Sequence, residues 1–143
     1  MKARCATLEA RRRYTPNTVW DTFPWPQNPT ETQIEQVVNC VRDLLHERNK
    51  ELNDYRYSLR DLYRIVEKPG KNKIRELHIA LDKAVIAAYG FDEKKDILAQ
   101  LLELNLAVAE KEENGEDVQA PGLPKCVNDQ AKFVNEYCVK FEY

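Results

Sequence analysis

Residues 30–53 read TETQIEQVVNCVRDLLHERNKELN, and this stretch carries the clearest structural signal in the chain. Its apolar residues recur every three or four positions, which is the spacing of one buried helix face: Ile34, Val37, Val38, Val41, Leu44, Leu45 and Leu52. Thr30 and Gln33 stand three apart at its start, as a helix-capping box requires. We therefore predict an amphipathic helix over about residues 31–53.

The same period continues along the chain with breaks between the segments. Ser58, followed by an acidic residue three positions later, opens a second short helix that ends near Lys68. After a proline and a glycine, a third helix is expected over about 72–89, ended by a further glycine. Asp92 is the expected N-cap of a fourth helix that ends at an Asn-Gly pair. Because strand signals are nearly absent, we predict an all-α fold, a small bundle of about four helices.

The two ends of the chain lack this helical period. Residues 14–29 contain four prolines interleaved with aromatic rings, so this segment is predicted to be an extended aromatic strap. The residues after 114 have no sustained period, and only a short docked turn or strand is expected among a few apolar side chains there: Val127, Phe133, Val134, Tyr137 and Val139. The expected organisation is a basic arm and strap over 1–29, a helical bundle over 30–114 and an irregular tail over 115–143.

Length and composition exclude several classes of protein. A chain of 143 residues with 32% charged side chains has room for one modest core. Its four glycines have no phosphate-cradling spacing, which excludes a Rossmann fingerprint and a P-loop. No apolar run is long enough for a membrane span or a secretory signal, so a cytoplasmic protein is expected. No zinc pattern can be formed from its two histidines and its four cysteines, which we expect to be free thiols: Cys5, Cys40, Cys126 and Cys138.

Candidate catalytic groups occur only singly or in pairs, so no catalytic residue is predicted. His78 and Asp82 stand four apart on one expected helix, which permits a side-chain pair that we interpret as structural. His46 is interpreted as a solvated or capped histidine. The remaining candidates are read as packing or rim aromatics and as an amide that bonds a backbone group or loop: Tyr55, Tyr57, Tyr63 and Asn105.

The N-terminal arm is the strongest functional signal in residue chemistry alone. The chain has a net charge of −2, yet residues 1–13 hold five basic side chains and one acidic one. Guanidinium groups and hydroxyls are common phosphate-contacting groups in DNA-binding proteins. The candidates for DNA contact are therefore in or beside this arm, although a solvated or protein-docked arm remains an alternative: Arg4, Arg11, Arg12, Arg13 and Tyr14.

Several segments, read in order, resemble one known family. They are RYTPNTVWDTFPWPQ at 13–27, SLRDLY at 58–63 and LDKAVIAAYGF at 81–91, followed by LLELN at 101–105 and APGLP at 120–124. These segments resemble the C-terminal region of large class I S-adenosylmethionine-dependent DNA methyltransferases of type II restriction-modification systems. The resemblance extends from about residue 13 to residue 140 and rests most on the strap and on the 81–91 stretch.

The resemblance implies a role without catalysis for this chain alone. In that family the strap closes the target-recognition domain, and the following helices pack back on the recognition and methylase domains. The family's cofactor pocket needs a glycine-bearing loop after a strand, and its adenine pocket needs an Asn-Pro-Pro-aromatic motif. Neither motif occurs here, and the nearest match, Asn28-Pro29-Thr30, lacks the second proline and the aromatic residue. S-adenosylmethionine is thus expected only in the parent enzyme, and no metal is expected.

The resemblance also implies partners. Weak backbone contact with DNA and docking to the remaining methyltransferase and recognition domains are expected, with no membrane partner. Because Met1 stands just upstream of the strap, the resemblance suggests a split or truncated gene or a separately encoded subunit. Without the recognition domain, three strap aromatics would be more exposed and would be candidates for partner docking: Trp20, Phe23 and Trp25. The alternatives are an independent helical protein-interaction module and a small enzyme that uses His78 and Asp82.

Overall fold

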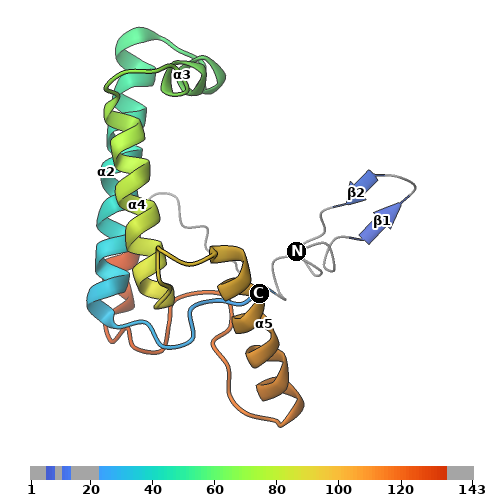
Figure 1. The fold of residues 1–143 in the computed structure, drawn as a ribbon. Helices are drawn as coiled ribbons and strands as arrows, with labels where there is room; N and C mark the ends of the chain where they lie inside the picture. Colours follow the sequence, from blue (N-terminus) through green and yellow to red (C-terminus); the bar gives the residue numbers. More distant parts are fainter. Residues whose placement is uncertain (1–5, 9–10, 14–22, 135–143) are drawn as a thin grey trace. The chain divides into compact units, whose positions relative to one another are not determined.

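A computed structural model describes residues 6–8, 11–13 and 23–134. It confirms the predicted all-α class, with four α-helices in the described part of the chain (Figure 1). The elements in chain order are the strands β1 (Ala6–Leu8) and β2 (Arg11–Arg13), the α-helices α2 (Glu31–Tyr55), α3 (Leu59–Val66), α4 (Lys73–Tyr89) and α5 (Ile97–Glu113), and the 3-10 helix η1 (Gln130–Phe133).

The basic arm contains a short hairpin that is not predicted from the sequence. β1 and β2 pair in an antiparallel register that places Thr7 opposite Arg12, with Ala6 opposite Arg13 and Leu8 opposite Arg11. Three-residue strands are too short to show an alternating apolar pattern, which is the usual sequence signal of a strand. Within the arm, residues 6–8 and 11–13 are therefore hydrogen-bonded to each other.

The chain divides into two compact units, and each is described by itself. One unit comprises residues 30–88 and holds α2, α3 and all of α4 except its last residue. The other comprises residues 1–29 and 89–143, which include α5 and η1. The division at residue 30 coincides with the expected start of the bundle, whereas α5 groups with the strap and the C-terminal segment instead of with α2–α4.

The start of α2 is set by local hydrogen bonds that the spacing of Thr30 and Gln33 predicts. The Gln33 backbone N–H donates to the Thr30 hydroxyl at 3.3 Å, and the Thr30 backbone N–H donates to the Gln33 side-chain oxygen at 2.8 Å. This reciprocal capping box satisfies two N–H groups that the helix leaves without partners. At its other end α2 stops at Arg56, whose backbone has a φ of 52°.

The core of the 30–88 unit is one small cluster to which each helix contributes a single buried side chain. Leu44 of α2, Leu62 of α3 and Ile74 of α4 are 7%, 2% and 2% exposed. Four partly buried residues pack around them: Leu52, Val66, Leu77 and Leu81. Ser58 caps α3, since its hydroxyl accepts the Asp61 backbone N–H at 3.2 Å, and this fixes the turn of α3 on which Leu62 lies.

The connection between α3 and α4 is held by one guanidinium group. Arg75 donates to the Gly70 carbonyl at 2.7 Å and also to the carbonyls of Val66 and Lys68. These contacts occupy carbonyls at and just beyond the end of α3, where the helix itself supplies no donors. The Arg75 backbone N–H in turn donates to the Asn72 side chain at 3.0 Å. A single residue of α4 thus fixes the direction in which α3 leaves the core.

The start of α5 corrects one prediction. The N-cap is Asp96, whose carboxylate accepts the Leu98 backbone N–H at 2.9 Å, and not Asp92. Asp92 instead forms a preceding turn, in which its carboxylate accepts the Lys94 N–H at 2.9 Å. Gln100 reaches back to this turn and bonds both the N–H and the carbonyl of Asp92, at 2.8 and 3.0 Å. Both aspartates are residues that commonly cap helices. The bonds from Gln100 to Asp92, eight residues apart, hold Asp92 in the turn, and α5 begins after Asp96 instead.

The expected docking of the C-terminal segment is partly within the described residues. Val127 and Phe133 are buried, at 6% and 9% exposed, and the second of them ends η1, whereas Val134 is 59% exposed and is not docked as expected, because it follows the last turn of η1. Tyr137 and Val139 lie outside the described residues. No helix in the described part of the chain combines the length and apolar content that crossing a bilayer requires.

The small core generates a stability prediction. Replacing Leu62 by alanine removes the most deeply buried side chain of the cluster, so we expect the free energy of unfolding to fall by about 2–5 kcal/mol. Urea denaturation followed by circular dichroism measures this change. Leu59→Ala on the same helix is the matched control, because Leu59 is 50% exposed and its loss should cost less than about 0.5 kcal/mol. Equal losses in the two variants would contradict the assigned core.

Candidate functional site

The described part of the strap is anchored to the residue that ends α4. The Tyr89 hydroxyl donates to the Pro24 carbonyl at 3.2 Å, and Pro24 is buried. On either side of this proline, Phe23 and Trp25 are half-buried and contact each other edge to face, with ring centroids 5.9 Å apart. The Tyr89 ring also packs on Phe91 at 4.9 Å. Burial raises the pKa of the Tyr89 phenol above its ordinary value.

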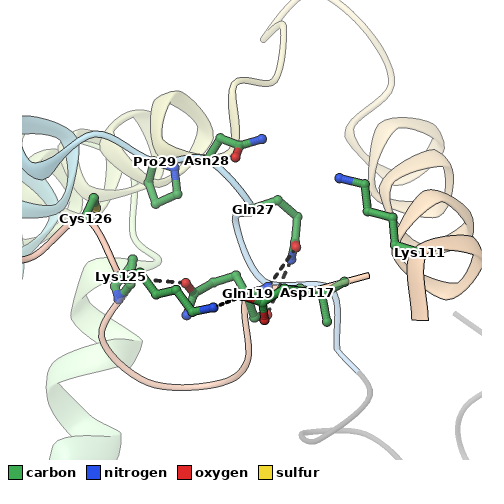
Figure 2. A pocket seen from close by; sticks show the side chains of 10 residues that line it. Gln27, Asn28, Pro29, Lys111, Asp117, Gln119, Lys125 and Cys126 are labelled. Carbon is green, nitrogen blue, oxygen red and sulfur yellow. Dashed lines mark hydrogen bonds and ion pairs between the residues drawn. The ribbon is translucent and has the colours of Figure 1, made fainter. Parts of the chain in front are cut away.

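A second contact joins the strap to the C-terminal segment. The Gln27 amide accepts the Gln119 backbone N–H at 2.9 Å and donates to the Gln119 carbonyl at 3.4 Å. Its amide nitrogen also donates to the Trp25 carbonyl at 2.8 Å. One side chain therefore pairs with a backbone 92 residues away in the manner of a neighbouring strand, as Figure 2 shows. The strap and the segment after α5 are held together by directional bonds.

A cavity of about 380 Å³ lies beside this amide pair (Figure 2). Its lining is mostly polar: Gln27, Asn28, Pro29, Lys111, Asp117, Val118, Gln119, Pro124, Lys125 and Cys126. Lys125 forms an ion pair with Asp117, whereas Lys111 has no ion-pair partner among the described residues. The lining groups are amides, one thiol, the ion pair of Lys125 with Asp117 and the Lys111 ammonium, so the cavity can accept hydrogen-bonding groups, or an anion at Lys111. It lies within the unit of residues 1–29 and 89–143.

The residues expected to contact DNA or a partner lie mostly in the arm and the first part of the strap. Arg11, Arg12 and Arg13 form β2, and their backbone is all that is described there. Arg4, Tyr14 and Trp20 lie outside the described residues. Phe23 and Trp25 are described and are half-buried against each other, with part of each ring still open to solvent.

One of the two histidine candidates has a different partner from the one expected, whereas the exposure of His46 agrees with its interpretation as a solvated histidine. His78 pairs with Tyr63 and not with Asp82: the Tyr63 hydroxyl lies 3.0 Å from His78 Nε2, and the rings meet edge to face at 5.7 Å. This contact joins α3 to α4, because the two residues lie on facing turns of the helices. His46 is exposed on α2. The interpretation of Tyr63 as a packing aromatic agrees with this contact.

Of the two roles expected for the other tyrosines, packing or rim aromatics, the exposure of Tyr55 and Tyr57 fits the rim. Tyr55 and Tyr57 are 60% and 37% exposed, and their rings are stacked at 5.4 Å with an interplanar angle of 18°. The sequence signal that could have identified them is the Tyr-Arg-Tyr triplet at the end of a long helix, directly before a run rich in basic residues. Asn105 is half-buried on α5, on the side where the apolar residues were expected.

The glycines of the chain do not fit the S-adenosylmethionine loop of the resembled family. Such a loop joins a strand to a helix, whereas these glycines follow helices or lie in the C-terminal segment: Gly70, Gly90, Gly115 and Gly122. We assign no cofactor contact to the described residues. Among these residues no group of three metal-ligating side chains is found, and Cys40 and Cys126 are free thiols. Cys5 and Cys138 lie outside the described part.

Comparisons with known proteins give no relative for this chain. No protein-family model matches its sequence, and no curated protein or solved structure matches it.

Tyr89 generates a prediction about alkaline pH. Because its pKa is raised in the folded state, the neutral phenol stabilises the fold in full below the ordinary pKa of 10.0. This contribution is lost as the pH rises through the raised value. We therefore expect Tyr89→Phe to lower the melting temperature at neutral pH and to lose less stability between about pH 9 and pH 12 than the unmodified chain does.

Thermal melting followed by circular dichroism at a series of pH values measures this difference. Tyr55→Phe is the matched control, because the Tyr55 ring is exposed and its substitution should leave the pH dependence unchanged. The assignment fails if Tyr89→Phe and Tyr55→Phe have the same melting profile across this range.

Proposed function

We propose that this chain is a non-catalytic helical C-terminal module of a restriction-modification DNA methyltransferase, most plainly an adenine-specific one, acting in the cytoplasm. In this role it supports the target-recognition domain and adds weak contacts to the DNA backbone. S-adenosylmethionine and the reacting base would be held by methylase domains outside this chain. The observation that carries the proposal is the ordered series of resembling segments, above all the strap at 13–27 and the stretch at 81–91.

The described contacts are compatible with a supporting role. The strap is tied at Pro24 to the end of α4 and at Gln27 to the C-terminal segment. A strap fixed at two points presents its remaining aromatic surface in a defined position, which a docking partner can use without ordering the segment first. Phe23 and Trp25 are the described residues of that surface, and the undescribed Trp20 is the third docking candidate.

One observation favours the alternative of an independent protein-interaction module. α5 has no buried residue, and three leucines spaced four apart are more than half exposed along it: Leu98 at 65%, Leu102 at 56% and Leu106 at 62%. A continuous exposed apolar stripe is typical of a protein-binding face. In the methyltransferase proposal the recognition or methylase domain covers this stripe, whereas in the alternative an unrelated partner does.

The proposed DNA contact predicts a change in affinity and in salt dependence. Replacing Arg11, Arg12 and Arg13 together by alanine should weaken binding to duplex DNA and reduce the slope of log affinity against log salt by about 3, close to one per lost phosphate contact. Fluorescence anisotropy at several salt concentrations measures both quantities. The control removes three exposed lysines from α4 and the loop after it, Lys83, Lys94 and Lys95, with the same change in net charge. An arm variant that binds like the control would refute the contact.

The methyltransferase role predicts complementation. This chain alone should transfer no methyl group from S-adenosylmethionine to mixed-sequence DNA, because it lacks the cofactor and adenine motifs. Mixed with the product of the adjacent upstream open reading frame, it should restore transfer, measured as radiolabel incorporated into DNA. Transfer by this chain alone would overturn the proposal. Inactivity of the mixture, with both chains folded by circular dichroism, would favour the interaction module.

A further inference from the structure

The connection between α2 and α3 borders a pocket that the proposed function does not use. This pocket measures about 300 Å³ and lies within the unit of residues 30–88. Its lining combines two aromatic rings, three aliphatic side chains and three polar groups: Tyr55, Tyr57, Leu62, Ile65, Ile74, Glu51, Asn72 and Lys73. The volume is at the lower limit of small-ligand sites.

The aromatic wall of the pocket is built by an unusual helix end. Arg56 takes a left-handed conformation, with a φ of 52°, directly between Tyr55 and Tyr57. The two rings stack on each other at 5.4 Å, yet both remain more than a third exposed. Exposed aromatic rings that pack on each other and not into the core leave a flat π surface open to solvent. Such a surface suits stacking by another planar ring.

The sequence from Arg56 to Arg75, which supplies most of the pocket lining, is strongly basic. Between Arg56 and Arg75 the sequence holds seven basic and two acidic side chains, whereas residues 31–54 of α2 hold three basic and six acidic ones. Arg75 is occupied by the end of α3, and Arg64 pairs with Asp61 at 3.7 Å. The other five cations are exposed and form no salt bridge with any described residue: Arg56, Arg60, Lys68, Lys71 and Lys73.

The position of these cations is set by the fold. Four of them lie on α3 and on the two connections that flank it, the segment that Figure 1 shows across the end of α2 and α4, and the fifth, Lys73, begins α4. Lys73 is both a pocket residue and the first residue of α4, so its ammonium group and the positive end of that helix act at the same place. Glu51 supplies the one negative charge of the lining, so a bound phosphate belongs at the Lys73 rim and away from Glu51.

We propose that this pocket binds an unpaired nucleotide of a nucleic acid strand. The base stacks on the Tyr55 and Tyr57 surface, and the flanking phosphates contact Lys73 and the other exposed cations. A cationic ligand is disfavoured because the segment from Arg56 to Lys73 carries five exposed cations that form no salt bridge with any described residue. A duplex is disfavoured because its bases are already stacked inside the helix and cannot reach a tyrosine face. The site is on the 30–88 unit and is independent of the arm that the methyltransferase proposal uses.

The test uses the full chain and a fluorescein-labelled oligothymidylate of about 12 nucleotides, which is within the length that single-strand sites cover. Replacing Tyr55 and Tyr57 together by alanine should weaken binding about 5- to 150-fold, the loss expected for one stacked base. Replacing both by phenylalanine keeps the aromatic faces and should keep the affinity within about 2-fold. Anisotropy gives the affinities, and circular dichroism shows that each variant is folded.

The contribution of the cations is tested with a separate variant and its control. Lys73→Gln should weaken binding and lower the salt slope by about 0.7, the value for one phosphate of a single strand. Lys83→Gln is the control, because Lys83 is exposed on the same helix but does not line the pocket. The affinities for oligothymidylate and oligouridylate of equal length are then compared. The oligonucleotide that binds more tightly shows whether the site takes a DNA strand or an RNA strand.

Three results would overturn this inference. The first is unchanged oligothymidylate affinity in the alanine double variant. The second is an equal loss in the phenylalanine double variant, which would assign the effect to the hydroxyls and not to stacking. The third is binding of polyglutamate with the same affinity as oligothymidylate, which would make the surface a general anion patch. The alanine variant of Arg11, Arg12 and Arg13 is measured in parallel, and it should keep the tyrosine-dependent part of the affinity even if the methyltransferase proposal fails.

Discussion

The packing of Leu62 between Leu44 and Ile74 is the interaction on which the 30–88 unit depends. Each of its three helices supplies only one buried residue to the cluster, so none can lose its contribution without exposing the other two. α3 is only eight residues long and is too short to persist alone in water. It is held by Leu62 at its centre, by the Ser58 cap at its start and by Arg75 at its end. A small core buries little apolar area, so hydrogen bonds at the helix ends are needed to hold the helices in place.

The helices could be predicted from sequence because their signals are local. The apolar period of α2 and the spacing of Thr30 and Gln33 fall within one or two turns, and both appear in the structure. The N-cap of α5 could not be predicted, because Asp92 and Asp96 are equally good caps and Gln100 bonds the earlier one into a turn. The grouping of α5 with the strap in one unit could not be predicted from sequence either. In the same unit the strap bonds the segment after α5 through Gln27 and Gln119, a contact that no local pattern encodes.

The candidate sites show the same division between local and distant information. Arginines in a row are visible in the sequence, and so is an aromatic strap, but the cavity beside Gln27 requires residues from both ends of the chain. His78 was paired with Asp82 by helical spacing, yet the phenol of Tyr63 on the neighbouring helix is its partner. The interpretation of Tyr55 and Tyr57 as packing or rim aromatics leaves open how far their rings are exposed. Their exposure follows from the left-handed backbone at Arg56, which a side-chain pattern does not reveal.

That left-handed residue has a consequence for how this protein would respond to selection. A non-glycine side chain in this conformation costs on the order of 1 kcal/mol, and asparagine tolerates it better than arginine does. Variants enriched for thermal resistance should therefore collect substitutions at Arg56. Each such gain in stability would remove the Arg56 cation beside Tyr55 and Tyr57. A more heat-resistant chain would therefore have less positive charge around the two tyrosines. Natural retention of arginine at this strained position would mark it as a residue kept for what it contacts and not for how it folds.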